Sequence, residues 1–441
     1  MKNQASLRDT LSRKIKRTFI PLLLITFCPP IVILIWYTNV LLNGSFKLLW
    51  DFFSHEGVYQ AFQKMWWPVF WGSPIAWKMI SLFFIAQLLI MKFTPGRKFF
   101  GPLTPKGNVP IYKANGPQAF FISVGLFYVF SFKLHLFSPS CIYDHFGEIL
   151  GALNILSLGF CVFLYFKGKY FPSSSDSGSS GNPIFDYYWG TELYPRVLGW
   201  DVKKFVNCRF GLVAWSLIII SFAAKQHQLY GLSDAMLLMV MLQLVYLVKF
   251  FVWETGYLGS IDIMHDRAGF YIIWGSMVWL PGVYPSATLY LVNHPKHLGF
   301  PLFATIFMLG TASILLTYFA DRQRQQVRMM NGECRVWKKE PQLIIASYTT
   351  QTGEQKQSLL LASGFWGISR HFHYVPEFLG AFFWTVPVLF DSVMPYFYVL
   401  FLIVLMLERA WRDDARCARK YGDDWKRYCR KVPYKILPYV Y

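Results

Sequence analysis

Titratable side chains gather in a short segment between two long apolar runs of the sequence. Glu254 and Tyr257 are followed by Asp262 and His265, and Asp266 stands next to the histidine. Acidic groups and histidine are costly at membrane depth unless they are paired or functional, so their default interpretation is a site. Carboxyl, phenol and imidazole groups can all act as proton donors in catalysis. A cluster that merely reaches the membrane surface would give the same pattern, and that interpretation stays open.

Two basic stretches could bind an anion. Arg324 and Arg328 are four residues apart, which places both guanidiniums on one helical face, where they suit phosphate oxygens. A second face near the end of the chain combines cations, a carboxylate and a thiol at steps of three and four residues: Arg409, Asp413, Arg416, Cys417 and Lys420. Its cations could take the phosphates of a cofactor and its carboxylate a ribose or base. For the first pair alone, a positive anchor at the cytoplasmic end of a membrane span is the competing interpretation.

Several common sites are absent from the sequence. It has no G-x-G-x-x-G or G-x-x-x-x-G-K-[ST] pattern for nucleotides, and no G-x-S-x-G or H-E-x-x-H pattern for hydrolysis. The pairs His371/His373 and His294/His297 have no carboxylate or cysteine partner at a convincing spacing, so we expect no metal. Seven cysteines without a C-x-x-C pair indicate neither a disulfide framework nor a zinc site. The residues alone thus indicate a membrane protein with a cytoplasm-facing anion or nucleotide site.

The elements that must position these groups are apolar helices. Hydrophobic residues make up 54% of 441 positions and charged residues only 15%, against about 25% in a typical soluble protein. Backbone groups in lipid must be satisfied within their own segment, which favours helices over strands. We therefore predict an all-α polytopic membrane protein with about ten transmembrane helices. The apolar runs are approximately 18–42, 72–92, 117–138, 147–167, 209–224, 233–253, 269–292, 298–320, 376–391 and 395–408.

Details of these runs give further expectations. The last two are short for full spans and could form a helical hairpin that turns near Asp391 to Pro395. Five prolines inside the runs predict kinks: Pro29, Pro30, Pro281, Pro285 and Pro387. Four tryptophans suit an interfacial belt: Trp66, Trp67, Trp71 and Trp77.

Basic residues at both ends of the chain set the expected orientation. Residues 1–17 contain Lys2, Arg8, Arg13, Lys14, Lys16 and Arg17 against one acidic residue, and the C-terminal tail is also strongly basic. By the positive-inside rule both termini are cytoplasmic, which requires an even number of crossings. The first apolar run has no small-residue cleavage pattern, so we interpret it as a retained anchor. The net charge of +19 then needs no nucleic-acid partner.

The polar clusters divide the chain unevenly. We expect an N-terminal transmembrane part at 1–171, a flexible Ser/Gly-rich loop at 172–185, and a C-terminal transmembrane catalytic part at 186–441 that holds almost all the polar clusters. Residues 331–357 alternate like a small cytoplasmic hairpin that turns at Gly353 and would act as a lid or brace.

In their order along the chain, these clusters resemble the sterol reductase family, which includes delta-14 and delta-7 reductases and the lamin B receptor. The motifs that carry the resemblance are Gly190-Thr-Glu-Leu-Tyr-Pro-Arg196, Ser363-Gly-Phe-Trp-Gly-Ile-Ser-Arg-His-Phe-His-Tyr374 and Arg412-Asp-Asp-x-Arg-Cys-x-x-Lys-Tyr-Gly422. The resemblance covers about residues 95–441. Within the family the sequence is most similar to the plant-like form of the delta-7 branch, through segments such as Gly101-Pro-Leu-Thr-Pro-Lys-Gly107 and Asp262-Ile-Met-His-Asp266.

The resemblance implies NADPH as the reductant, bound between the cytoplasmic ends of the later helices. Carried over by motif, Arg324 and Arg328 would hold phosphates. The nicotinamide side would be lined by Leu361, Trp366 and His373, and the rest of the cofactor would be held by Arg409, Asp413, Cys417 and Tyr421. The family pattern often has Asn where Tyr194 and His373 stand here, and Lys where Arg324 stands.

The implied reaction adds a proton and a hydride to the 7,8 double bond of a delta-5,7 sterol that enters from the bilayer. Protonation at carbon 8 would leave a cation spread over carbons 5 to 7, and hydride at carbon 7 would restore the 5,6 double bond. The proton donor must lie within hydrogen-bond reach in a dry pocket. Tyr257, Asp262, His265, Glu254 and His373 are candidates, and the sequence leaves the choice open.

Alternatives remain from the same and from other classes. A delta-14 sterol reductase would use the same cofactor face. The Arg370-His371-x-x-Tyr374-x-x-Glu377 pattern is similar to that of isoprenylcysteine methyltransferases, and a non-catalytic sterol-binding protein is a third option. Family analogy implies the endoplasmic reticulum membrane in a eukaryote or the inner membrane in a bacterium. Its partners would then be membrane lipid, the sterol and other enzymes of the sterol pathway, with no nucleic acid.

Overall fold

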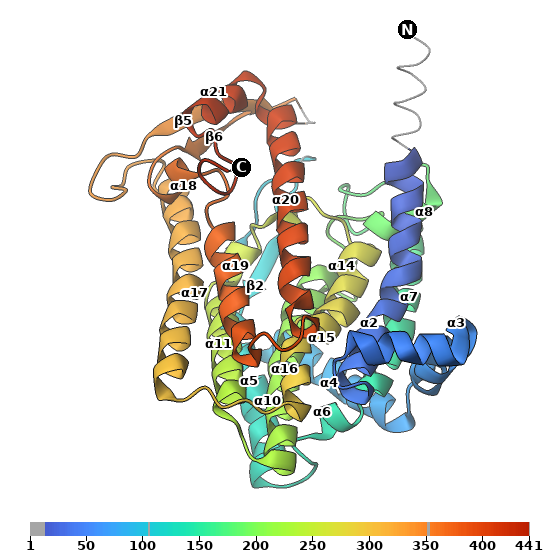
Figure 1. Ribbon diagram of the computed structural model, residues 1–441. Coiled ribbons are helices and arrows are strands. Elements are labelled where there is room, and N and C mark those ends of the chain that lie inside the picture. Colours follow the sequence, from blue (N-terminus) through green and yellow to red (C-terminus); the bar gives the residue numbers. More distant parts are fainter. Residues whose placement is uncertain (1–13, 105, 351–352, 441) are drawn as a thin grey trace.

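The computed structural model describes residues 14–104, 106–350 and 353–440. Most of them are helical, and the long helices stand side by side in one bundle (Figure 1). With η marking π- and 3-10-helical turns, the helical elements are η1 (Ile15–Phe19), α2 (Ile20–Leu41), α3 (Phe46–Phe70), α4 (Pro74–Phe93), α5 (Gly116–Tyr128), η2 (Val129–Lys133), α6 (Cys141–Asp144), α7 (Phe146–Tyr170), α8 (Pro183–Trp189), α9 (Val202–Lys204), η3 (Phe205–Gly211), α10 (Leu212–Tyr230), α11 (Asp234–Val252), α12 (Glu254–Tyr257), α13 (Ile261–Met264), α14 (Phe270–Trp274), η4 (Gly275–Trp279), α15 (Leu280–Val283), α16 (Ser286–Asn293), α17 (Phe300–Met329), α18 (Phe365–Ile368), α19 (Tyr374–Thr385), η5 (Val386–Val388), η6 (Met394–Tyr396), α20 (Phe397–Tyr421) and α21 (Asp423–Lys431). The strands are β1 (Arg97–Phe100), β2 (Ile111–Ala114), β3 (Arg196–Val197), β4 (Trp200–Asp201), β5 (Leu343–Thr349) and β6 (Gln355–Leu361).

Among the described residues, seven helices are long and apolar enough to cross a membrane. They are Ile15–Leu41, Pro74–Phe93, Phe146–Tyr170, Val202–Tyr230, Asp234–Val252, Phe300–Met329 and Met394–Tyr421. Each coincides with one of the ten predicted apolar runs, which confirms the polytopic helical class. The other three runs, 117–138, 269–292 and 376–391, are also helical, but their helices are shorter or interrupted.

Prolines account for much of the interruption in the last two of these runs. Pro281 is the second residue of α15, which follows the π-turn η4 directly, and Pro285 immediately precedes α16. Pro387 lies in the 3-10 turn η5 that ends α19. A proline removes one backbone donor and clashes with the preceding turn, so breaks at these points are expected. By contrast, α2 continues as a helix through Pro29 and Pro30.

The C-terminal hairpin differs from the prediction in the length of its second arm. Helices α19 and α20 contact each other, and the chain turns at residues 389–393, close to the predicted turn. However, α20 continues through the charged residues after 408 as far as Tyr421, and this arm belongs to one of the seven candidate spans. The expectation of a short arm was wrong because it followed apolar residues only, whereas the charges at this end of α20 face a cavity.

Helix α3 was not expected from the apolar runs. It is capped by Ser45, whose side chain accepts from the Leu48 backbone amide, and it bends at Gly57, where φ is 72°. In Figure 1 it lies across the direction of the bundle helices. Trp67 and Trp71 at its end are largely exposed. The interfacial belt of tryptophans stays a prediction.

The first described residues and the C-terminal helix α21 lie at the same end of the bundle (Figure 1). Among the predicted N-terminal cations, Lys2, Arg8 and Arg13 lie outside the described residues. Ends on one side require an even number of crossings, while seven candidate spans is odd. The shorter helical stretches must therefore contribute at least one crossing. Which end faces the cytoplasm stays a prediction.

A small hairpin covers this end of the bundle, as predicted, with strands that extend slightly past the expected segment. Strands β5 and β6 pair antiparallel from Leu343 opposite Leu361 to Thr349 opposite Gln355. Its buried face packs against the C-terminal helix, where Ile344 and Leu360 join Trp425 and Tyr428 in one apolar cluster. The hairpin therefore braces β6, whose last residue reaches the site described below.

Two glycines hold the segment 254–269 against the motif at 190–196. A Cβ on Gly190, where φ is 100°, would meet the Ala268 backbone at 2.6 Å, and a Cβ on Gly269 would meet the Gly190 nitrogen at 2.3 Å. The Ala268 amide donates to the Glu192 carbonyl. The Ser/Gly loop is tied to this region, because Arg267 donates to the Gly178 carbonyl. Glycine is required at both positions for the two segments to approach so closely.

Candidate functional site

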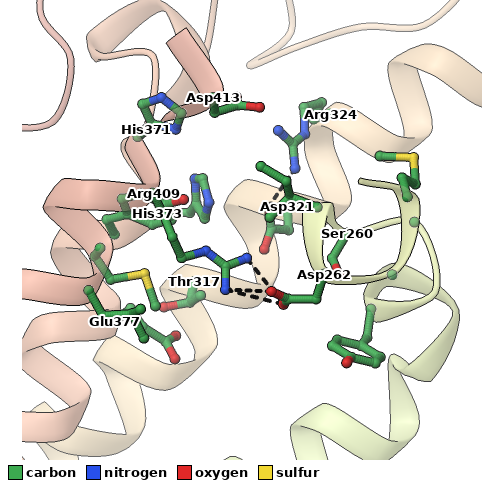
Figure 2. A pocket seen from close by; sticks show the side chains of 18 of the residues that line it. Ser260, Asp262, Thr317, Asp321, Arg324, His371, His373, Glu377, Arg409 and Asp413 are labelled. Carbon is green, nitrogen blue, oxygen red and sulfur yellow. Dashed lines mark hydrogen bonds and ion pairs between the residues drawn. The ribbon is translucent and has the colours of Figure 1, made fainter. Parts of the chain in front are cut away.

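Two adjoining cavities lie between α17, α19, α20 and the segment around α12 and α13. The first has a volume of about 390 Å³ and is shown from close by in Figure 2. The second has a volume of about 650 Å³. Both are lined by Trp253, Asp321, Arg324, Arg328, Arg416 and Tyr421, among others. The shared walls make the two cavities parts of one site.

All nine residues predicted to bind the cofactor line the first cavity. They come from four parts of the chain that are distant in sequence: Arg324 and Arg328 from α17, Leu361 from β6, Trp366 and His373 from the segment around α18, and Arg409, Asp413, Cys417 and Tyr421 from α20. The structure thus brings together every member of this set. Their binding of a cofactor stays a prediction.

Local contacts fix the orientation of Trp366 and Arg324. The Trp366 indole nitrogen donates to the Ala320 carbonyl at 2.8 Å, and the ring lies buried against α17. The Arg324 guanidinium lies 3.8 Å from the centre of that ring, while its Nη2 donates to Asp321 at 3.2 Å. The aromatic face attracts the cation, and among the described residues only Nη2 of this guanidinium donates to a carboxylate, so its other donors remain for a ligand.

The helical spacing of α20 places its charged side chains on one face, as predicted. Asp413 accepts from Arg416 at 2.9 and 2.6 Å, and the Cys417 thiol lies 3.9 Å from the same carboxylate. Residues three and four apart are neighbours on a helix surface, which explains this cluster. Asp413 is therefore already engaged by a cation of its own helix.

Positive charge exceeds negative charge around the second cavity. Its lining contains Arg324, Arg328, Arg416 and Lys420 against the single carboxylate of Asp321. Within the described part of the chain, neither Arg328 nor Lys420 forms an ion pair with a carboxylate, and the Lys420 ammonium lies 3.8 Å from the centre of the Tyr348 ring. Uncompensated cations in a concave site suit the phosphate groups of a ligand.

Of the proton-donor candidates in the segment 254–266, Tyr257 and Asp262 line the first cavity. The Tyr257 hydroxyl is buried and has no hydrogen-bond partner among the residues that the structure describes. Burial raises the pKa of Tyr257 well above its ordinary value, and the charge of Asp262 acts in the same direction. The phenol is therefore protonated near neutral pH.

Asp262 forms a two-point ion pair across the cavity. Arg409 Nη1 lies 3.0 and 3.2 Å from its two oxygens, and Arg409 Nη2 lies 3.2 Å from the second (Figure 2). A parallel pair lies behind it, where Arg412 Nη1 donates to Asp266 at 2.9 Å. These contacts join α20 to the α12–α13 segment. The carboxylate of Asp262 is thus held in an ion pair and is not free to act as a proton donor.

The structure places the other two proton-donor candidates of that segment elsewhere. His265 lines the second cavity, and its Nδ1 lies 2.8 Å from Asp266. Glu254 is not among the residues that line either cavity; it is buried in an ion pair with Arg209 at 2.6 Å, and Lys204 lies 4.0 Å away. Glu254 thus anchors α12 against η3, and the sequence could not reveal this partner because it lies 45 residues away.

Two histidines of the second motif border the first cavity in the neutral form. Burial lowers the pKa of His371 to about 4, and burial together with the charge of Arg324 lowers the pKa of His373 well below its ordinary value. The His373 ring packs against Trp366 with centroids 4.9 Å apart. Its Nδ1 has no partner among the described residues. His373 can therefore offer a neutral imidazole to a ligand.

Sequence reasoning missed three residues of the cavity wall. Tyr246 and Lys249 on α11 and Glu377 on α19 line the first cavity, and Glu377 accepts from the Tyr246 hydroxyl at 2.8 Å. Lys249 carried a usable signal, because a lysine inside an apolar run at membrane depth defaults to a functional hypothesis. Glu377 belonged to a motif noted in the sequence, but no role in the site was predicted for it.

Known proteins resemble this chain over nearly its whole length. Residues 21–441 match the model of the ergosterol biosynthesis ERG4/ERG24 family. A 7-dehydrocholesterol reductase of Arabidopsis thaliana is 50% identical over 422 residues, which cover 95% of this chain and 96% of the relative. A 7-dehydrocholesterol reductase of Xenopus laevis is 37% identical, covering 82% and 79%. A delta(14)-sterol reductase of Methylotuvimicrobium alcaliphilum is 32% identical, covering 98% and 97%.

Proposed function

The chain belongs to the ERG4/ERG24 family and is a sterol reductase, an oxidoreductase that acts on carbon–carbon double bonds; from this premise we propose that it reduces the 7,8 double bond of delta-5,7 sterols with NADPH. The names of the plant and frog relatives support the choice of double bond. The observation that supports the reaction type is the site itself. The buried phenol of Tyr257 lines the first cavity, and the adjoining second cavity is lined by cations.

The residues present fit a phosphorylated dinucleotide. Arg328 and Lys420 carry charge that no carboxylate in the described structure balances, and Arg324 keeps guanidinium donors free above Trp366. These side chains would hold the phosphates, and Trp366, His373 and Leu361 would lie along the nicotinamide. Bound NADPH would supply the hydride. The protein's own residues must then orient the sterol, exclude water and deliver the proton.

Tyr257 is the best-placed proton donor. Its hydroxyl is buried, protonated and without a hydrogen-bond partner in the described part of the chain, whereas both oxygens of Asp262 are engaged by Arg409. Because its pKa is lowered, His373 is a neutral imidazole near neutral pH and has no imidazolium proton to donate. We assign to Tyr257 the transfer of its phenolic proton to carbon 8 of the diene, and to Asp262 the positioning of Arg409. Solvent protons reach the phenolate afterwards through the second cavity.

The mechanism and the double bond are tested by separate measurements. Expression in a host that accumulates 5,7-dienes should remove the 7,8 double bond from its sterols, and a Tyr257→Phe variant at equal expression should not. Deuterium from labelled NADPH should appear at carbon 7 and deuterium from heavy water at carbon 8. An unchanged sterol profile with well-expressed wild-type protein would overturn the proposal.

A delta-14 reductase is the second candidate, because relatives with that name match nearly the whole chain. It would reduce an 8,14-diene from the same cofactor chamber. Purified protein offered both substrates in parallel separates the two activities, and the higher kcat/KM decides between them. For location we propose a eukaryotic endoplasmic reticulum membrane or a bacterial inner membrane, where the sterol reaches the site from the bilayer.

A further inference from the structure

A buried ion pair lies in the wall of the first cavity and has no part in the proton or cofactor roles above. Glu377 on α19 faces Lys249 on α11, with 3.9 Å between Oε2 and Nζ. Both side chains are largely buried, at 14% and 13% exposure. The Tyr246 hydroxyl fixes the other carboxylate oxygen from a distance of 2.8 Å. Figure 2 shows Glu377 one turn below His373 on the cavity side of α19.

The cavity that holds this pair has charged groups such as Asp321 in one part of its wall and apolar and aromatic side chains in another. The same cavity is lined by Leu212, Leu280, Leu402, Leu405 and Met406, with Trp215 nearby. Taking two charges out of water costs several kcal/mol each, and a loose pair returns only part of that cost. Intramembrane charges are for this reason usually functional. An ion pair at this position therefore indicates a ligand with at least one polar atom on an otherwise apolar body.

The geometry of the pair leaves both partners with unused capacity. A charge-assisted N–H···O bond is ordinarily about 2.7–2.9 Å long, so the 3.9 Å separation is too wide for a direct hydrogen bond. In the described part of the chain, Oε2 of Glu377 accepts no hydrogen bond and Nζ of Lys249 donates none. An acceptor and a donor thus face each other across a gap.

A hydroxyl group matches this gap chemically. The carboxylate can only accept, the ammonium can only donate, and a hydroxyl does both with one oxygen atom. A ketone or an ether only accepts, and so would leave Glu377 unpaired. We propose that Glu377 and Lys249 bind the 3-hydroxyl group of the sterol and set which end of the molecule enters the chamber. This inference rests on the proposed function, because it assigns a substrate contact within the same site.

The location of the pair agrees with the way a sterol lies in a membrane. Lys249 lies one turn before the end of its span at Val252, and Glu377 lies in the first turn of α19. The start of α19 lies on the side of the bundle that carries the hairpin and the C-terminus (Figure 1). A sterol keeps its hydroxyl at the polar boundary and its tail in the hydrocarbon. It can therefore move sideways into this cavity without turning over.

The decisive experiment compares substrates in the purified wild-type protein. Reduction of a 5,7-diene sterol with a free 3-hydroxyl is measured beside its 3-methyl ether and its 3-deoxy analogue, with saturating NADPH. We expect KM to rise about 10- to 100-fold for both analogues, because each leaves a buried charge unpaired. Equal kcat/KM for all three substrates overturns the proposal without any variant. Absence of reduction of every 5,7-diene instead overturns the proposed function.

Variants locate the contact. Glu377→Gln and Lys249→Met should raise KM for the hydroxysterol about 10-fold or more, yet leave KM for the 3-deoxy analogue almost unchanged, because that analogue has no oxygen atom to contact the pair. Lys64→Met is the matched control, since it removes a lysine from an exposed ion pair with Glu56 on α3. Stabilisation by NADPH confirms that each variant is folded. Equal losses on the hydroxysterol and the 3-deoxy analogue would assign the pair a structural role and refute the inference.

Discussion

The Arg409 guanidinium holds both carboxylate oxygens of Asp262 across the mouth of the site, at 3.0 and 3.2 Å. The arginine belongs to α20 and the aspartate to the short helix α13, 147 residues earlier in the chain. This contact closes one side of the first cavity beside Tyr257. The position of the proposed proton donor thus depends on an ion pair between two distant motifs.

We predict that Asp262→Asn weakens both the fold and the activity. The change leaves a largely buried guanidinium without its counter-charge, so the free energy of unfolding should fall by about 3 kcal/mol. The rate should fall as well, because the segment that carries Tyr257 loses its anchor. Asp423→Asn is the control: its pair with Lys426 is exposed to water on α21 and should contribute little to stability. Similar thermal stability of the two variants would contradict the prediction.

Replacing the phenol of Tyr257 should act on the chemical step alone. Tyr257→Phe keeps the ring that packs against Phe250, with centroids 5.2 Å apart, and removes only the hydroxyl. We expect kcat to fall by about 10²- to 10⁴-fold while NADPH affinity stays the same, since general acid catalysis contributes on that scale. Steady-state assays and cofactor titration measure the two quantities.

A second buried phenol provides the control for this change. The Tyr112 hydroxyl also has no partner among the described residues, but Tyr112 is not part of the lining of either cavity. Tyr112→Phe should leave kcat within a few-fold of wild type. If both variants retain full activity, the proton comes from another group.

The convergence of the cofactor set was predicted partly from helical spacing and partly from the family resemblance, which alone supplied Leu361, Trp366, His373 and Tyr421. Arg324 and Arg328 shared a helical face by their four-residue step, and Arg409, Asp413 and Cys417 followed the same rule on a helix near the C-terminus. Helical periodicity is a local property, so side chains that share a helix face can be predicted from the sequence without knowledge of the fold. The resemblance to a family then joined the separate faces into one site.

Contacts between distant elements could not be predicted in the same way. Glu254 looked equivalent to Asp262 in the sequence, yet its carboxylate meets Arg209 from η3, while Asp262 meets Arg409. Helix α3 was missed because Lys, Glu, Gln and His interrupt its apolar residues, and its position across the bundle depends on its neighbours. Such pairings are set by tertiary packing, which no local pattern encodes.

Removing an unbalanced cation from the second cavity should weaken cofactor binding. Arg328→Met and Lys420→Met each delete a positive charge that no carboxylate in the described structure neutralises. Neither change therefore leaves a carboxylate without its ion-pair partner. We expect Kd for NADPH to rise about 10-fold in each, with a smaller rise for NADH, which lacks one phosphate. Lys426→Met, on the exposed side of α21, should leave Kd unchanged. Equal affinity of all three variants for NADPH would place the phosphates elsewhere.

Acid should destabilise the protein through His371. Burial lowers the pKa of this side chain from 6.5 to about 4 in the folded state, so the imidazole is neutral there while the unfolded chain binds a proton more readily. The free energy of unfolding therefore falls as pH drops through the window from 6.5 to 4, by about 2 kcal/mol at pH 5, and is unaffected by this group above that window. Thermal unfolding in detergent at pH 7.5 and pH 5 measures the effect.

A variant that cannot titrate isolates this contribution. His371→Gln is neutral at every pH, so the difference in unfolding free energy between pH 7.5 and pH 5 should shrink by about 2 kcal/mol relative to wild type. The remaining slope belongs to other groups that face the cavity, including His373, whose pKa burial also lowers. His55→Gln, which replaces an exposed histidine on α3, is the matched substitution control. If His371→Gln loses as much unfolding free energy between pH 7.5 and pH 5 as the wild type does, the prediction is wrong. The acid sensitivity then comes from groups other than His371.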